Sequence, residues 1–319
     1  MTQQFFIYAA INIFVALVSA PFFMGVIKKV KALCQGRHGP QLLQPYYNLI
    51  KLFSKEVVVS KDSSWITRIT PYINMSIMVL AVLFIPLIFV PVNNTVFGNI
   101  ILLIYLFAIA KFFMALAGLD AGSAFGGMGS SREMSFSSII EPVTIIVFLA
   151  LAFVFKTTNL FDITRETAMH NIFSINPLLV LLAVSLFIIL ITESSRIPVD
   201  NPETHLELTM IHEAMLLEQS GKNLALMEWS SALKQTILMA ILINIFFPVG
   251  LIPINLITQS SPMLLLVSAF LFLVKGIALS VVIALFESYL AKLRLFLLPT
   301  LFAIPFFLAF LTIVIEVFI

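Results

Sequence analysis

Long uncharged runs of mostly apolar residues dominate the pattern along the chain. A helix that crosses a bilayer needs about 20 such residues in a row. Six runs approach or exceed this length, and the two longest have room for two helices each. The runs cover residues 1–27, 69–110, 134–155 (interrupted only by Glu141), 176–192, 235–274 and 295–315. The pattern therefore predicts about eight transmembrane helices.

Turn signals divide the two longest runs. Pro91-Val92-Asn93-Asn94 interrupts the first, and the stretch from Pro253 to Pro262 interrupts the second. Stretches rich in Pro, Asn and Ser are typical of turns. Since the sequence contains no repeat or linker, we expect one all-α, polytopic membrane domain over residues 1–319.

The composition excludes other classes of protein. The 319 residues are 61% hydrophobic and only 11% charged, whereas soluble domains have about 25% charged residues. A soluble enzyme is therefore excluded, and so is intrinsic disorder, which needs low hydrophobicity. The single cysteine, Cys34, cannot form an intrachain disulfide or a CxxC metal site. Any iron–sulfur centre must then lie on another chain, while haem ligation by histidine stays open.

The basic residues are distributed unevenly between the predicted loops. Of the 18, fourteen fall in four segments, whereas Lys156 and Arg165 fall on the opposite side. The positive-inside rule makes the four segments cytoplasmic and the N-terminus external. We expect a multi-pass protein of the cell inner (plasma) membrane that contacts lipid and protein partners but no nucleic acid. The four segments are residues 28–68, 119–133, 194–234 and 285–294.

Two cytoplasmic segments have distinctive patterns. From Leu42 to Val57, apolar residues recur at helical spacing, which predicts an amphipathic helix. Such a helix either lies at the membrane surface or forms a docking surface for a cytoplasmic subunit. Residues 117–133 contain five glycines but no nucleotide-binding pattern. Small residues there favour either close backbone packing or an irregular stretch that lines a cavity.

Charged residues inside the predicted spans are candidates for function. Glu141, followed by Pro142, is either a neutral hydrogen-bonded side chain or a proton-relay site. Lys111 lies near enough to the cytoplasmic end to extend its ammonium group to the interface. Lys275 lies deeper, so we expect it to pair with an acid or to belong to a polar track.

Seven acidic residues gather between Glu193 and Glu228. They form either a solvated loop, as most charge runs do, or a folded re-entrant segment, which Pro198 and Pro202 favour. Asn201 is placed to cap a helix that starts at Pro202 and carries Glu203 and Glu207 on one face. A metal site using His205 and His212 has no recognised ligand spacing.

Taken together, the motifs resemble the membrane subunit shared by respiratory complex I and the group 4 membrane-bound nickel–iron hydrogenases. Within that family they look most like hydrogenase-4 component C and formate hydrogenlyase subunit 4. The matching motifs, in family order, are Gln35-x-Arg37-x-Gly39-Pro40, Leu43-Gln44, Ile50-Lys51-Leu52-Phe53, Ala117-Gly118-Leu119-Asp120-x-Gly122-Ser123, Arg132 with Glu141 nine later, Glu193-x-x-Arg196-x-Pro198-x-Asp200, Glu203-x-x-x-Glu207-Leu208, Glu218-x-Ser220-Gly221 and Ala284-Leu285-Phe286-Glu287-x-x-x-Ala291-Lys292-Leu293-Arg294-Leu295.

The resemblance implies eight transmembrane helices and a place where the membrane arm meets the cytoplasmic redox arm. It also implies an acidic funnel of Glu141, Glu193, Asp200, Glu203 and Glu207 and basic positions at Arg37 and Arg196. Together with the other residues singled out in the sequence, these give two sets of candidate site residues. The candidate proton path comprises Glu141, Glu193, Asp200, Glu203, His205, Glu207, Glu213, Glu218, Lys275 and Glu287. The candidate docking or cavity set comprises Gln35, Arg37, Gly39, Pro40, Lys51, Asp120, Arg132 and Arg196.

Two features differ from complex I. His205 stands where complex I commonly has a third acid, although histidine also titrates near neutral pH. The stretch between Leu208 and Glu218 is longer than in complex I by about three residues, in the loop that would contact quinone. Binding of quinone, and with it the alternative of a quinone-reducing complex I component, therefore stays open.

The resulting hypothesis is a subunit that is non-catalytic on its own and belongs to a hydrogenase-4-like or complex-I-like oxidoreductase. It would anchor the redox arm and couple it to proton movement. The expected partners are antiporter-like membrane subunits, an iron–sulfur small subunit and a large subunit. These partners would hold the iron–sulfur clusters and any nickel–iron site, and this chain would bind no cofactor or metal. A stand-alone ion transporter and a purely structural anchor are the rival hypotheses.

Overall fold

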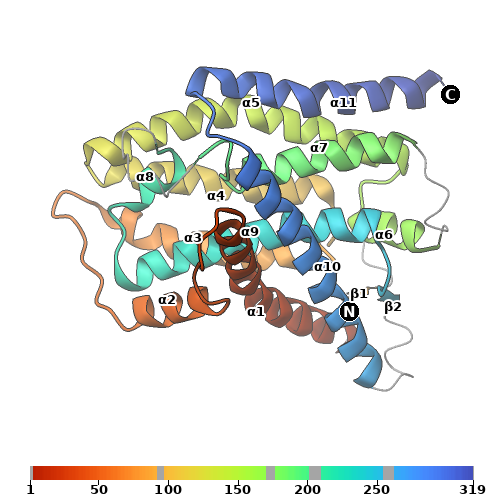
Figure 1. Ribbon diagram of the computed structural model, residues 1–319, viewed down its shortest axis with the longest axis horizontal. Helices are drawn as coiled ribbons and strands as arrows, with labels where there is room; N and C mark the ends of the chain where they lie inside the picture. Colours follow the sequence, from red (N-terminus) through yellow and green to blue (C-terminus); the bar gives the residue numbers. More distant parts are fainter. Residues whose placement is uncertain (1–2, 92–96, 170–176, 201–209, 254–261, 319) are drawn as a thin grey trace.

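The computed structural model describes residues 3–91, 97–169, 177–200, 210–253 and 262–318. These residues form helices joined by short connections, with one two-stranded pair (Figure 1). In chain order the elements are α1 (Gln3–Cys34), α2 (Gln44–Phe53), α3 (Trp65–Val82), β1 (Phe89–Val90), α4 (Ile100–Asp120), α5 (Ala124–Val154), α6 (Leu160–Met169), α7 (Pro177–Glu193), α8 (His212–Leu216), α9 (Gly221–Phe246), β2 (Ile252–Pro253), α10 (Pro262–Tyr289), the 3-10 turn Leu295–Leu297 and α11 (Leu298–Phe318).

The helices confirm the prediction of an all-α, multi-pass membrane protein. Within the described ranges, seven of them are long and apolar enough to cross a membrane, namely α1, α3, α4, α5, α9, α10 and α11. The apolar helix α7 is shorter and corresponds to the short run predicted over 176–192. Together they match the eight predicted spans.

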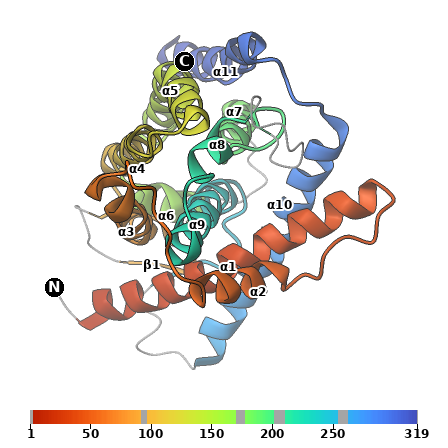
Figure 2. The same cartoon turned by 90° about the vertical axis from the view of Figure 1, so that its left-hand side faces the viewer.

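Helix α9 lies at the centre of the molecule. It packs against α1, α3 and α7, and 78% of its most apolar window is buried, compared with 22% for α11. Two pairs of packed helices, α1 with α10 and α5 with α11, lie at opposite flanks of this centre (Figure 2). Helix α9 can therefore contact residues from most of the bundle.

Several helices extend beyond the predicted spans into the predicted loops. Helix α5 begins at Ala124, where the hydroxyl of Ser123 accepts a hydrogen bond from the Gly126 amide at 3.0 Å. Helix α9 begins at Gly221, which places Lys234 well inside it. The predicted loops 119–133 and 194–234 were therefore too long. A helix of 31 residues is about 46 Å long, so it continues past a hydrocarbon core of about 30 Å with polar side chains.

The glycine-rich segment packs helices closely together. A Cβ on Gly126 would meet the carbonyl of Gly118 in α4, and a Cβ on Gly129 would lie 2.9 Å from the Ala214 Cβ in α8. Close packing was thus the correct alternative, and an irregular stretch was wrong, because only residues 121–123 separate α4 from α5.

This packing predicts different effects for two neighbouring glycines. Gly129→Ala is expected to displace α8 and to destabilise the protein by about 1–3 kcal/mol, because the new methyl group has no space. Gly127→Ala is the matched control, since a Cβ at Gly127 meets nothing within 4 Å, and it is expected to be neutral or slightly stabilising. The thermal unfolding midpoint of each purified variant in detergent measures the difference. Equal midpoints would contradict the close contact between α5 and α8.

A buried stretch without helix follows α3. Asn12 donates to the carbonyls of Val82 and Ile85 at 2.9 and 2.7 Å and accepts from the Leu87 amide at 3.1 Å. Strand β1 then pairs in parallel with β2. Non-helical backbone at membrane depth requires such partners, because lipid supplies none.

Candidate functional site

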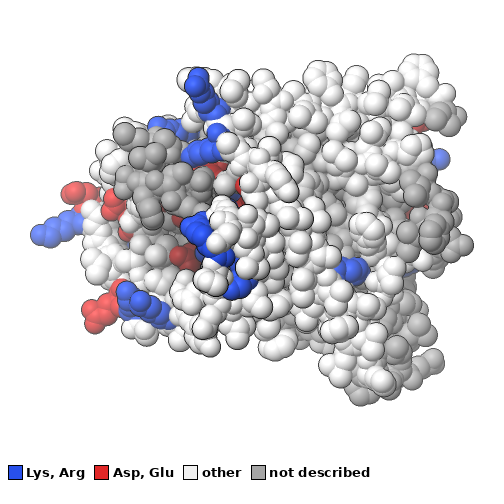
Figure 3. Space-filling view, in the orientation of Figure 1, with Lys and Arg blue, Asp and Glu red and all other residues white. Residues whose placement is uncertain are grey.

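Charged side chains gather at one end of the molecule, which we call the charged end. Figure 3 shows them at the end where α2 and α8 lie in Figure 1, and most of the rest of this face is uncharged. The predicted docking residues around the connection from α1 to α2 are at the surface. Gln35, Arg37 and Gly39 are exposed and Pro40 is half-buried, and the Arg37 guanidinium donates to the Gln35 side chain.

The amphipathic helix is α2, and it is shorter than predicted. Its inner face contains buried Leu49 and half-buried Phe53, and the Phe53 ring lies 6.1 Å from that of Trp229 in α9. Its outer face exposes Tyr47 and Ile50, next to exposed Lys51. The outer face is compatible with both predicted roles, a membrane-surface helix and a docking surface.

Glu193, at the end of α7, forms a buried ion cluster with two lysines. Its Oε1 lies 2.6 Å from the Lys111 ammonium in α4, and its Oε2 lies 2.7 Å from the Lys234 ammonium in α9. The three side chains are 5–13% exposed. Removing charges from water is costly unless they are paired. We call Lys111, Glu193 and Lys234 the Glu193 cluster.

Three adjoining cavities share Lys111 and Glu193 in their walls. The first is also lined by Glu133 and His212, the second by Glu141 of α5 and the third by Ser137. Within the described structure, Asn74 Oδ1 in the first cavity and Ser137 Oγ in the third are buried atoms without a protein hydrogen-bond partner. Buried polar atoms of this kind are typical partners of internal water. Lys111 and Glu193 thus share a cavity wall with Glu133 and His212 in the first cavity and with Glu141 in the second.

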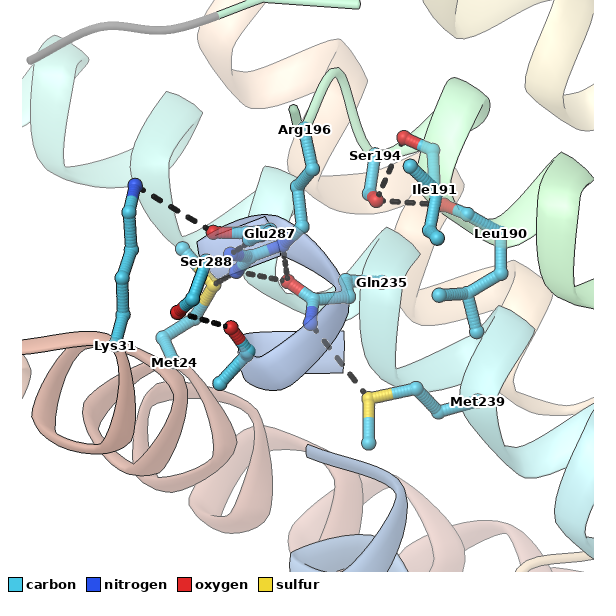
Figure 4. A network of polar contacts seen from close by, with 11 residues as sticks. Met24, Lys31, Leu190, Ile191, Ser194, Arg196, Gln235, Met239, Glu287 and Ser288 are labelled. Atoms are coloured by element: carbon cyan, nitrogen blue, oxygen red, sulfur yellow. Dashed lines mark hydrogen bonds and ion pairs between the residues drawn. The ribbon is translucent and has the colours of Figure 1, made fainter. Parts of the chain in front are cut away.

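Arg196 forms the centre of a second cluster (Figure 4). Its Nη1 donates to Glu287 Oε1 of α10 at 2.7 Å, while Nε and Nη2 donate to Gln235 Oε1 of α9 at 3.1 and 2.7 Å. The Lys31 ammonium of α1 lies 3.6 Å from Glu287 Oε2. We call Lys31, Arg196, Gln235 and Glu287 the Arg196 cluster. It joins three helices to the segment that follows α7.

Asp200 is the third charged residue in the range 193–200, after Glu193 and Arg196. Its Oδ1 lies 2.8 Å from the Lys292 ammonium, and its Oδ2 accepts from the amides of Ile211 and His212 at 2.9 and 3.1 Å. Residues 193–200 therefore direct three charges toward different elements. The predicted helix after Asn201 lies outside the described residues, as do Glu203, His205 and Glu207.

The remaining predicted site residues lie outside the Glu193 cluster and the Arg196 cluster. Asp120 accepts from the amides of Ser64 and Thr67 and from the Thr67 hydroxyl, so it holds the start of α3. Arg132 donates to the Met210 carbonyl at 3.0 Å. Glu213 lies on α8 and Glu218 just after it, and both are half-buried.

Two lysines differ from their predicted environments. Lys275 donates to the carbonyls of Phe247 and Val249 at 3.0 and 2.8 Å, and in the described part of the chain no acid pairs with it. The physical reason is that α9 ends beside it, where unsatisfied carbonyls favour a cation. Lys111 does not extend to the interface, since it is paired with Glu193 inside the bundle. The sequence did not identify Lys234 and Gln235 as site residues. The predicted span began at Gln235 and left Lys234 in a loop, whereas α9 begins at Gly221.

Nearly the whole chain matches a known protein family. The family model described as NADH dehydrogenase matches residues 7–317, a range that contains both ion clusters and all three cavities. The chain belongs to the NADH dehydrogenase family.

Relatives in this family cover much of the chain. Formate hydrogenlyase subunit 4 of Escherichia coli is 35% identical over 294 residues, which are 92% of each chain. Hydrogenase-4 component C of the same organism is 32% identical over 292 residues, 92% of this chain and 90% of the relative. A subunit of the NADH-quinone oxidoreductase of Anaplasma marginale is 30% identical over 213 residues, 60% of each chain.

The fold is also found in a solved structure. A chain of the membrane-bound sulfane sulfur reductase, an archaeal respiratory membrane complex, superposes with a TM-score of 0.80. The match covers 98% of this chain and 99% of that one, at 22% identity. The comparisons confirm the predicted membership of the NADH dehydrogenase family, and the described helices confirm a multi-pass membrane protein.

Proposed function

We propose that this chain is a membrane subunit of a hydrogenase-type oxidoreductase complex and couples its redox arm to proton movement. The observation that carries the coupling role is the position of Glu193. It lies in the walls of all three cavities, between Glu133 and His212 on one side and Glu141 on the other. Carboxylates and histidines that line cavities inside a membrane protein are the usual components of proton relays.

The hydrogenase type is favoured by the relatives that match over nine tenths of their length, which are subunits of formate hydrogenlyase and hydrogenase-4. In this proposal the charged end docks an iron–sulfur small subunit and a large subunit, and antiporter-like subunits lie beside the chain in the cell inner membrane. Iron–sulfur clusters and any nickel–iron site belong to those partners. Among the described residues, no three His, Cys, Asp or Glu side chains are grouped so as to hold a metal ion.

Glu141→Gln tests the coupling role. The amide keeps the size of the side chain but cannot ionise, so we expect the complex to assemble and to keep its redox turnover while proton movement per turnover is lost. The complex is purified through a tag on this chain, its subunits are identified by mass spectrometry, and proton movement is measured in proteoliposomes. Glu166→Gln, at an exposed position of α6, is the matched control.

Three outcomes separate the rival functions. Full proton movement in Glu141→Gln would contradict a relay through this residue. Loss of assembly alone after neutralising Glu193 and Asp200 together would favour a structural anchor. A chain that purifies without partners and moves ions by itself would favour a stand-alone transporter.

A further inference from the structure

Lys111 lies between the two acids that the proposed function connects. Its ammonium contacts Glu193 Oε1 at 2.6 Å, and it lines one cavity together with Glu141 and Glu193. A lysine carries its charge on a flexible four-carbon stem, so it can change partner without movement of the backbone.

Glu193 does not need Lys111 in order to remain paired. Lys234 contacts its other oxygen at 2.7 Å, and the same ammonium lies 5.8 Å from the centre of the Phe107 ring. A cation over an aromatic face gains further stabilisation. Lys234 is therefore held by two contacts, and departure of Lys111 would leave no unpaired charge on Glu193.

We propose that Lys111 exchanges partners between Glu193 and Glu141 across the cavity that the three side chains line. When Glu141 is ionised, it receives the Lys111 ammonium while Glu193 keeps Lys234. No proton is transferred in this step, and the total charge of the cluster is unchanged. The inference rests on the proposed function, because it assigns to Lys111 the link between the charge of Glu141 and that of Glu193. The other titratable groups that line the cavities around Lys111 are Glu133, His212 and Lys234 in the first and Tyr105 in the second.

Lys111→Arg distinguishes exchange from a merely structural ion pair. The planar guanidinium binds a carboxylate through two parallel hydrogen bonds, so arginine is expected to stay on Glu193. We expect the variant complex to assemble and to keep its redox turnover but to lose proton movement. Lys222→Arg is the matched control, because it makes the same change at an exposed lysine of α9 outside the Glu193 cluster, and it is expected to keep proton movement. Full proton movement in Lys111→Arg would overturn the exchange.

A structural measurement separates this inference from the proposed function. In the Glu193→Gln complex, residue 193 has lost its charge, so electron cryomicroscopy is expected to show the Lys111 ammonium at Glu141. In Lys234→Met it is expected to remain on Glu193. A Lys111 that stays at residue 193 in both variants would overturn the exchange. Loss of proton movement in Glu141→Gln would in that case still support the proposed function.

Discussion

Glu193→Ala is expected to destabilise the protein by about 3–5 kcal/mol, the range observed when one partner of a buried ion pair is removed. The substitution leaves Lys111 and Lys234 close together without their shared carboxylate. We therefore expect little assembled complex at growth temperature, measured by the yield of the tagged chain and its thermal unfolding midpoint in detergent. Glu166→Ala, at an exposed position of α6, serves as control and is expected to change neither.

A triple substitution separates the stability of the Glu193 cluster from its function. Replacing a complete buried ion cluster by apolar residues of similar volume is often neutral or stabilising. The variant Lys111→Met, Glu193→Leu, Lys234→Met is thus expected to recover much of the stability lost in Glu193→Ala and still to lack proton movement. Recovery of stability and proton movement together would contradict the relay.

Arg196→Met is expected to destabilise the protein by a similar amount, about 3–5 kcal/mol. It removes the 2.7 Å contact to Glu287, which then keeps the longer 3.6 Å contact to Lys31, and it removes both donors to Gln235. Arg196→Lys is expected to be intermediate, because one ammonium cannot reproduce the guanidinium fork.

The thermal unfolding midpoints of both Arg196 variants are measured against Arg294→Met, which changes an exposed arginine of the same end. The effect of Arg196→Met is expected to remain at high salt, because buried pairs are weakly screened. Equal midpoints for Arg196→Met and Arg294→Met would show that the Arg196 cluster contributes no stability.

The sequence was sufficient to predict the membrane helices, because hydropathy over about 20 residues is a strong signal. The family motifs Glu193-x-x-Arg196-x-Pro198-x-Asp200 and Ala284-Leu285-Phe286-Glu287 also singled out four residues of the two clusters and their surroundings, Glu193, Arg196, Asp200 and Glu287. The sequence could not supply their partners. Lys111 and Glu193 are separated by 82 positions in the chain, and their contact depends on how α4 and α7 pack.

Errors in the predicted helix boundaries led to wrong expectations about which charged side chains are buried. Ending a span at the first charge put Lys234 in a loop, whereas α9 begins at Gly221 and carries Lys234 into the bundle. Lys275 was expected to pair with an acid or to belong to a polar track, whereas its partners are the backbone carbonyls of Phe247 and Val249 at the end of α9. The prediction for Glu203, His205 and Glu207 remains a prediction.

The central position of α9 has a consequence for how the chain is made. Together with α3, it is the least apolar of the seven long membrane helices, and it carries Lys234, Gln235 and Asn244 buried against its neighbours. Such a segment partitions poorly into lipid by itself. Glu193 contacts Lys234 of α9, and the Pro86 carbonyl accepts from Asn244 of α9. Both groups belong to segments synthesised earlier, so they must already be in place when α9 leaves the ribosome. Insertion of α9 is therefore expected to be sequential, because it depends on helices made earlier, α7 among them, for the partners of its polar side chains.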